Sequence, residues 1–433
     1  MKMSERSRHG SCGEMPRAGG LLRGTALFLL LSALLWRGVP ARGEQTYYDA
    51  RLLGKTPVVR SQGSLGTCWA LTAVSALEAA LLPEKHEVFS ADHMSLQNGF
   101  EITQQEGGDY KMIMAYLAGG EGPVYEKDDP YGDGETAAGL QPVLSVREIR
   151  VLEGKSGDEI KQMILTYGPV QTSLYMERST TAAALPYYNE ETFAFFYPEQ
   201  MKPTHDILVL GWDDAFPSDR FRTDPGMDGA WICQNTWGED FGDHGIFYVS
   251  YADANILGSG LAYCRMQEPD EQEHIYQNDM CGWQGIQGYE TNHCYFANVY
   301  TAERSEKITS IGMYSTGRHT EYDIWFVPRF QDTASFRTKE YVTEGQFDDE
   351  GYFTVDLEEP LPLEEGQTFA VVVFIRTEGS LKPVAVEMKK DRFTEGVVTE
   401  GKNGYVSLTA ELWEHTESRY GTNVCLKVYT LPQ

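Results

Sequence analysis

The strongest constraint on the fold is a change in the spacing of apolar residues at Gly168-Pro169. Before it, apolar residues recur at helical spacing over 70–81, 91–96, 110–118 and 160–164. After it, alternating or continuous apolar runs of strand length occupy 170–174, 207–210, 230–233 and 246–251. This first region therefore reads as a helical half followed by a strand half, and a cleft between two such halves is a common place for chemistry.

A second region follows the polar, acidic segment 268–273, which contains Pro269 and suits a domain boundary. Beyond it, Gly, Pro, Asp and Glu separate eight short runs of strand character, at 295–300, 308–314, 322–327, 352–357, 369–375, 384–388, 405–408 and 424–429. Eight strands with no long helix predict an all-β antiparallel sandwich. Since 433 residues exceed one ordinary core, we expect two domains, at 44–267 and 274–433.

The N-terminus has the three regions of a secretory signal. Basic residues precede an apolar core at 26–36, and the small-residue pattern Val39-Pro40-Ala41 follows. We expect residues 1–41 to be a signal peptide cleaved after Ala41, which places the protein outside the cell, secreted or at the surface. The alternative is a retained anchor, but the core is too short to cross a bilayer, so no transmembrane span is expected after signal removal.

The charge balance excludes several partners. The formal net charge is −28, and removing residues 1–41 makes it −32. Nucleic-acid binding requires Lys and Arg to neutralise phosphates, and an anionic membrane surface makes the same demand. The composition therefore indicates an acidic, exported protein that binds neither.

The stretch from Gln62 to Ala70 places a carboxamide six residues ahead of a cysteine that opens a helix. In the first helical turn, unpaired N–H groups and the macrodipole favour a thiolate over a thiol at Cys68. The Cys68 N–H and the Gln62 carboxamide can together donate two hydrogen bonds to an oxyanion. The alternative at this point is a buried structural cysteine, because free cysteine is among the most buried residue types.

A thiol nucleophile needs a base, and the base needs a group that orients it. His205 stands just ahead of the apolar strand 207–210, and Asn235 ends the next strand. The Asn235 amide can hold an imidazole ring, and Trp237 can shield that hydrogen bond from water. Taken separately, these residues also suit a core histidine and a turn asparagine.

These residues resemble the papain-like cysteine peptidases: Gln-x5-Cys-Trp-Ala, then His before a hydrophobic strand with Gly-Trp-Asp-Asp, then Asn-Thr-Trp-Gly. The resemblance covers about residues 50–265 and implies an α+β papain-like two-subdomain fold. It implies Cys68 as nucleophile, His205 as general base and then acid, and Asn235 as the residue that orients the ring. Gln62 with the Cys68 N–H would form the oxyanion hole.

The same resemblance implies the substrate-binding residues. Gly107-Gly108 matches a segment whose backbone pairs with an extended substrate by strand addition. Ser173 and Pro203 fall where the family lines its main specificity pocket, and Trp237 lies beside the site.

The sequence also departs from the family pattern. Leu65 and Gln105 stand where the family has two paired cysteines, which indicates a lost disulfide. Asp206 follows His205 where a small apolar residue is usual, and we expect it to raise the imidazole pKa. About twenty residues separate the expected leader from Gln62, too few for the family's usual inhibitory prosegment.

Residues 274–433 resemble the lectin-like sandwich that follows papain-like domains in exported proteins of Gram-positive bacteria. The strings that carry this resemblance include Tyr276-Gln277-Asn278-Asp279, Gly282-Trp283 and the closing segment 423–430. It implies binding of a cell-surface glycan. We expect no metal or cofactor, because His293-Cys294 has no second pair at ligand spacing.

The sequence thus predicts an exported cysteine peptidase that hydrolyses peptide bonds in a protein or peptide substrate through a Cys68 thioester acyl-enzyme. Residues 274–433 would form an accessory binding domain. Two alternatives stay open. One is an acyl transferase or transpeptidase with the same triad, and the other is a non-catalytic glycan-binding adhesin.

Overall fold

The computed structural model describes residues 45–177 and 185–433. The expected signal peptide and its cleavage after Ala41 lie outside the described residues. Thr46–Gln433 form one compact unit.

The helical half contains α2 (Cys68–Leu81), α3 (Ala91–Leu96) and α4 (Tyr110–Ala118), and α5 (Gly157–Tyr167) follows. All four confirm the predicted helices. The Ser90 hydroxyl caps α3 by accepting from the His93 N–H, and Ser156 with Glu159 forms a capping box on α5. Helix α2 is apolar on nearly every side and is buried from Trp69 to Ala79, as expected for a helix at the centre of a core.

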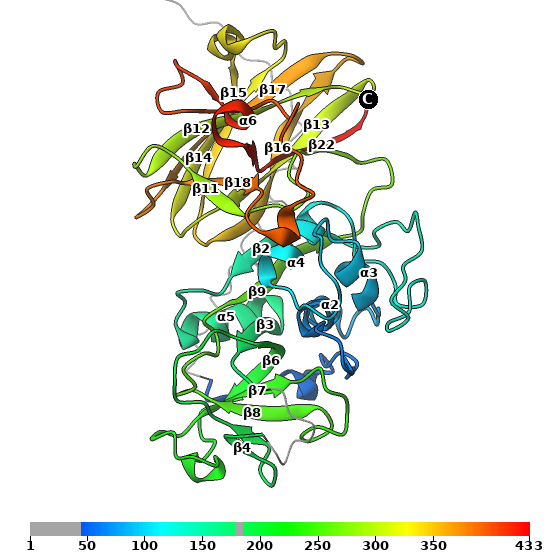
Figure 1. Cartoon of the computed structure of the whole chain (residues 1–433), viewed down its shortest axis with the longest axis vertical. Helices are drawn as coiled ribbons and strands as arrows, with labels where there is room; N and C mark the ends of the chain where they lie inside the picture. The colour runs from blue at the N-terminus through cyan, green and yellow to red at the C-terminus, as the bar shows by residue number, and fades with distance from the viewer. Residues whose placement is uncertain (1–44, 178–184) are drawn as a thin grey trace, which may run out of the picture. The chain divides into compact units, whose positions relative to one another are not determined.

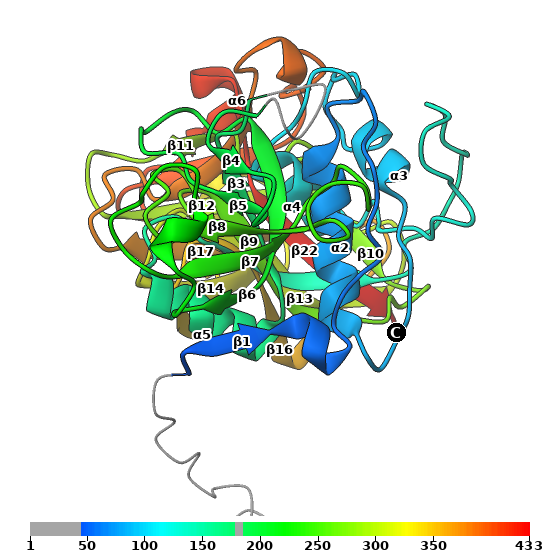
Figure 2. The same ribbon diagram turned by 90° about the horizontal axis from the view of Figure 1, so that it is seen from below.

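The strand half is antiparallel apart from the short parallel pair β5–β8. Its strands are β1 (Tyr47–Asp49), β2 (Ser145–Val151), β3 (Val170–Leu174), β4 (Tyr188–Asn189), β5 (Ala194–Phe195), β6 (His205–Asp213), β7 (Ala230–Gln234), β8 (Ile246–Ser250) and β9 (Gly260–Gln267). The four runs predicted here are confirmed as β3, β6, β7 and β8. Helix α2 packs on β6, β3 and β9, and in Figures 1 and 2 it lies beside these strands. This packing fixes the start of α2 next to the start of β6.

The second region is a sandwich built around a main apolar core, with a smaller buried cluster around Phe336. Its strands are β10 (His274–Tyr276), β11 (Gly285–Gln287), β12 (His293–Thr301), β13 (Glu306–Ser315), β14 (Thr320–Val327), β15 (Glu340–Phe347), β16 (Gly351–Leu363), β17 (Thr368–Thr377), β18 (Val384–Met388), β19 (Gly404–Ser407), β20 (Glu414–His415), β21 (Thr422–Val424) and β22 (Leu426–Pro432), with the short helix α6 (Thr416–Tyr420). One sheet has the order β15-β14-β17-β12-β19-β20. The predicted antiparallel sandwich is confirmed.

The two regions share one sheet. Strand β16 pairs with β2, with Tyr352 opposite Ile149, so the order β10-β22-β13-β16 continues through β2-β9-β3-β6 into the strand half. The sequence predicted neither β2 nor β9 as strands. The second region is therefore attached to the first by backbone hydrogen bonds as well as by the chain itself.

Candidate active site

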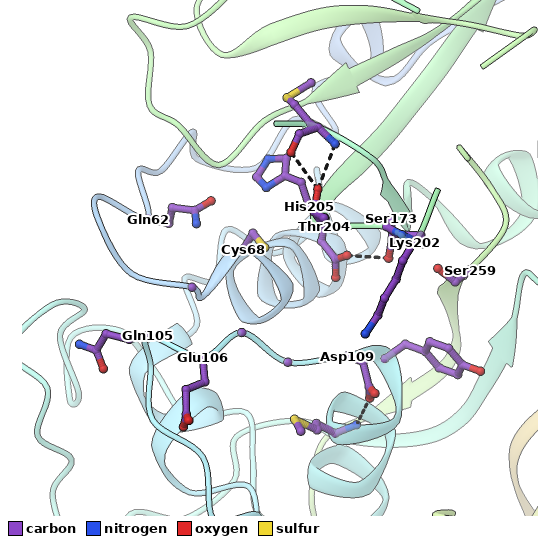
Figure 3. Close-up of a pocket in the computed structure, with 18 of the residues that line it drawn as sticks. Gln62, Cys68, Gln105, Glu106, Asp109, Ser173, Lys202, Thr204, His205 and Ser259 are labelled. Carbon is purple, nitrogen blue, oxygen red and sulfur yellow. Dashed lines mark hydrogen bonds between the residues drawn. The ribbon is translucent and has the colours of Figure 1, made fainter. Parts of the chain in front are cut away.

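A cleft of about 1070 Å³ separates the helical half from the strand half. On the helical side it is bordered by Gln62, Cys68 and Gly107–Gly108, and on the strand side by His205 and Trp237. Figure 3 shows Gln62, Cys68 and His205 around its centre. The structure thus brings together residues, from Gln62 to Trp237, that lie up to about 175 positions apart in the chain.

Cys68 is the first residue of α2. Burial and, to a smaller extent, the nearby Asp206 carboxylate raise the pKa of its thiol to about 12, against a lowering by hydrogen bonds from the backbone of Asp206, Trp69 and Cys68. The helix start therefore lowers the thiol pKa, as predicted, but burial has the larger effect. Desolvation of the charged form is the reason.

The orientation of the His205 ring follows from the Asn235 amide. Asn235 Oδ1 accepts the backbone N–H of Thr236 at 2.7 Å, and the same oxygen lies 2.7 Å from His205 Nε2. A backbone N–H only donates, so this amide atom must be the oxygen, and Nε2 must carry the proton. The neutral ring then leaves Nδ1 unprotonated as the basic nitrogen.

The hydrogen bond between His205 and Asn235 is shielded from water. Asn235 is 1% exposed and His205 5%. The Trp237 ring lies 4.8 Å from the imidazole, centroid to centroid, and Phe241 packs edge-on against Trp237 at 5.1 Å. Trp237 thus lies where the sequence predicted.

Burial lowers the pKa of His205 to about 4, against a smaller rise from the Asn235 hydrogen bond. The expected rise caused by Asp206 is wrong. His205 and Asp206 are consecutive in β6, so their side chains point to opposite faces of the sheet. With a raised thiol pKa and a lowered imidazole pKa, the resting pair is a neutral thiol and a neutral imidazole.

Gln62 is held from two sides. Its Nε2 donates to the Leu65 carbonyl at 2.7 Å, and its Oε1 accepts from the Thr236 hydroxyl at 2.7 Å. A carbonyl only accepts, so the amide orientation is fixed, and its second N–H has no acceptor among the described residues. One amide proton at the cleft therefore stays available for a ligand.

Two residues that support this site were not predicted. Thr236 bonds Gln62 through its hydroxyl and its carbonyl, which accepts the Gln62 N–H at 2.8 Å. The Tyr131 hydroxyl contacts Thr67 and donates to the Gln62 carbonyl at 3.2 Å. Thr236 lies between Asn235 and Trp237 in the Asn-Thr-Trp-Gly motif, and this position was a sequence signal that it belongs to the site. Tyr131 lies in the acidic, turn-rich segment 126–135, and nothing in its local sequence points to the site.

Positions 65 and 105 hold Leu65 and Gln105, and every described cysteine is free. Backbone packing joins the two segments instead. The Gly66 N–H donates to the Gln104 carbonyl at 2.7 Å, and a side chain at Gly66 would come within 2.8 Å of the Gly107 nitrogen. The Gln104 side chain is itself buried and donates to Asp92 and Ser95.

Gly107 and Gly108 follow on this segment and border the cleft, as predicted. A Cβ at Gly108 would lie 2.4 Å from the Trp69 ring, so only glycine fits there. The segment therefore presents bare backbone to the cleft directly beside Trp69 in the first turn of α2.

Ser173 and Pro203 also border the cleft. The Ser173 hydroxyl donates to Asp206 Oδ1 at 2.6 Å. Among the described residues, no group of three or more His, Cys, Asp or Glu side chains is arranged to hold a metal ion. No helix within the described part of the chain is long and apolar enough to cross a membrane.

Comparisons with known proteins match this geometry. Residues 45–268 match the family described as papain family cysteine protease, and residues 275–430 match the lectin like domain. Among curated proteins, the chain is 25% identical over 232 residues to cysteine proteinase 1 of Zea mays, covering 49% of this chain and 57% of that protein. It is 28% identical over 240 residues to cathepsin S of Mus musculus, covering 51% and 62%. The chain thus spans less than two thirds of the length of these relatives.

Two solved structures of Cwp84 share both regions. One, described as the cysteine protease and lectin-like domains of a surface layer associated protein of Clostridium difficile, is 23% identical with a TM-score of 0.78 and covers 90% of each chain. The other, a clostridial Cwp84 structure after propeptide cleavage, is 22% identical with a TM-score of 0.77 and covers 90% of this chain and 100% of that one. At this identity the likeness shows the fold.

Proposed function

We propose that this chain, which belongs to the papain family of cysteine proteases, hydrolyses peptide bonds through a thioester on Cys68. The observation that carries the proposal is the fixed Asn235 oxygen, which leaves His205 Nδ1 as the free basic nitrogen. It is supported by the fold and by the position of Cys68 in the same cleft.

The proposed reaction starts from the neutral pair. As Cys68 Sγ attacks the substrate carbonyl carbon, its proton passes to His205 Nδ1. The Cys68 N–H and the free Gln62 amide N–H stabilise the oxyanion that forms. The C–N bond then breaks, the amine leaves with the proton from Nδ1, and a thioester remains on Cys68.

Water completes the cycle. His205 Nδ1 takes a proton from a water molecule that attacks the thioester carbonyl, and the resulting oxyanion uses the same two donors. Collapse releases the carboxylic acid, and Sγ recovers the proton as a thiol. Asn235 holds the His205 ring in one orientation through acylation and deacylation. Trp237 shields the hydrogen bond between Asn235 and His205 from water.

The test treats the purified protein with an active-site-directed thiol reagent and, separately, with a fluorogenic peptide. We expect labelling at Cys68 and peptide hydrolysis, both lost in Cys68→Ala. Cys233 is fully buried and serves as an internal control that stays unlabelled. Absence of both labelling and hydrolysis would contradict the proposal. Addition of a nucleophilic amine distinguishes a transferase, because conjugates would then outnumber hydrolysis products by mass spectrometry.

For residues 274–433 we propose glycan binding on one face of the six-stranded sheet. Tyr295 lies 4.9 Å from Phe374 and 6.0 Å from Trp325, centroid to centroid, on the face opposite the sandwich core. Asp323 is the register partner of Phe374 on β14, on the side away from Tyr295, and Arg376 packs over Phe374. Aromatic faces pack against the C–H groups of a sugar, and the charged groups can hydrogen-bond its hydroxyls.

We propose that the protein acts outside the cell and that this face retains it at the surface. The Cwp84 structure, from a surface layer associated protein, supports the location. The test measures retention of Cys68→Ala on immobilised bacterial cell-wall polysaccharide, with and without a Trp325→Ala change. We expect the second change to abolish retention, and equal retention would contradict glycan binding at this face.

A further inference from the structure

The wall of the cleft beside Ser173 carries a buried carboxylate that the proposed chemistry does not use. Asp206 is 8% exposed and borders the cleft. Its Oδ1 accepts from the Ser173 hydroxyl and its Oδ2 from the Gln171 amide at 2.8 Å. Both donors are neutral, and no Lys or Arg among the described residues forms an ion pair with Asp206. Burying a carboxylate without a cation costs free energy. The position of Asp206 at a binding cleft therefore points to a cationic group of a ligand as its partner.

A second carboxylate faces the same space. Asp109 borders the cleft at the start of α4, and its charge is close enough to raise the pKa of Asp206 beyond the larger effect of burial. Asp109 Oδ1 accepts the N–H groups of Lys111 and Met112. In Figure 3, Asp109, Ser173 and Ser259 lie on one side of Cys68, and Gln62 and Gln105 lie on the other. One side of the cleft therefore carries two carboxylates and two hydroxyls.

The cleft as a whole is acidic but has apolar surface as well. Its lining includes six carboxylate side chains against two lysines, Lys202 and Lys390. Met112 and Met176 supply apolar lining. A long side chain with a methylene stem and a cationic end matches both features, because the stem can pack on the thioethers while the end reaches a carboxylate.

Lys202 is the cation nearest to this side in Figure 3. It is exposed and has no ion pair within the described part of the chain. Its charge is not among those that act on Asp206, whereas that of Asp109 is. In Figure 3 the amino end of Lys202 points toward Asp109, and Lys202 forms no ion pair with Asp206 among the described residues.

We propose that Asp206 makes this pocket select substrates that carry lysine or arginine on the acyl side of the scissile bond. The inference rests on the proposed peptidase function and names its substrate class. The side follows from the chain order, because Gly107-Gly108, the expected substrate-pairing segment, runs directly into Asp109. A substrate paired with that segment, with its carbonyl at Cys68, places its preceding residues next to Asp109 and Asp206.

The experiment compares hydrolysis of peptides that differ at one residue. Lysine, arginine, norleucine or glutamate is placed at each of the three residues before the scissile bond. We expect lysine and arginine to exceed norleucine at least tenfold in kcat/KM at one position, with glutamate lowest. Asp206→Asn should lower the lysine-to-norleucine ratio to about 1, while the matched control Asp240→Asn, which removes a cleft carboxylate beyond Trp237, should keep it.

Two further arms keep the inference separate from the proposed function and from misfolding. Lys202→Gln should raise the lysine-to-norleucine ratio, because it removes a competing cation. If no peptide is hydrolysed, the peptidase function fails, and calorimetric binding of the lysine and norleucine peptides to Cys68→Ala tests the pocket directly. Preference for norleucine at all three positions, an unchanged ratio in folded Asp206→Asn, or equal affinities in the binding arm would each overturn the proposal.

Discussion

Two groups of polar residues in the cleft differ in their electrostatics: a neutral side around His205, Asn235 and Gln62, and a charged side around Asp206 and Asp109. Around His205, Asn235 and Gln62, neutral groups are oriented by hydrogen bonds whose donors and acceptors are fixed by backbone atoms. Around Asp206 and Asp109, the polar groups are carboxylates, and Asp206 forms no ion pair among the described residues. The difference teaches that orientation of neutral groups suits proton transfer, whereas an uncompensated charge suits selection of a charged partner.

The largest effect is expected on the neutral side, at Gln62. Gln62→Ala removes one of the two proposed oxyanion donors, so kcat should fall by about 10²–10³ with little change in KM. Steady-state kinetics with a lysine peptide measures both constants. A rise in KM with kcat unchanged would instead show that Gln62 acts in ground-state binding, and it would weaken the contrast between the two sides.

Asn235→Ala should lower kcat/KM by about 10²-fold, because the ring loses the acceptor that fixes Nε2 as the protonated nitrogen. The side chain is buried, so thermal unfolding of the variant serves as the control for folding. A folded variant with full activity would show that the ring orientation does not depend on Asn235.

Much of this neutral side was predictable from sequence, and the charged side was not. Cys68, His205 and Asn235 each stand at an element boundary that hydrophobic periodicity locates, and their residue types match a known chemical arrangement. The partners of Gln62 are different, because Thr236 and Tyr131 act through tertiary contacts that leave no local pattern. The expected influence of Asp206 on His205 was wrong because strand alternation turns it away, toward Ser173 and Gln171.

The fold shows the same division. Helices α2 to α5 and the strands with alternating apolar residues were predictable, since burial on one face imposes a period. Strand β15 is half-exposed or exposed along most of its length and carries no such period. The pairing of β2 with β16 joins segments about 200 residues apart, which no local signal encodes.

The pH dependence should separate the two sides. Burial raises the pKa of Asp206 to about 6 and lowers that of His205 to about 4. As pH rises through about 4, His205 loses its proton and becomes a base, so hydrolysis of every peptide should increase. As pH rises through about 6, Asp206 becomes charged, so the lysine-to-norleucine ratio should increase by about tenfold. Kinetics from pH 3.5 to 8 measures both, and Asp206→Asn should remove only the second transition.

The smallest effect is expected at Thr236. Thr236→Val keeps the shape but removes the hydroxyl that holds Gln62 Oε1, so kcat should fall about tenfold or less, the worth of about one hydrogen bond. KM and the lysine-to-norleucine ratio should stay unchanged, because the variant does not touch the charged side. A changed ratio would show that the two sides are coupled.

The most direct test of the central claim is intact mass spectrometry of an acid-quenched turnover with a lysine-containing peptide ester. We predict an acyl adduct of the expected mass, mapped by digestion to the peptide that contains Cys68 and absent in Cys68→Ala. Turnover without any adduct, or an adduct on another residue that persists in Cys68→Ala, would contradict the account.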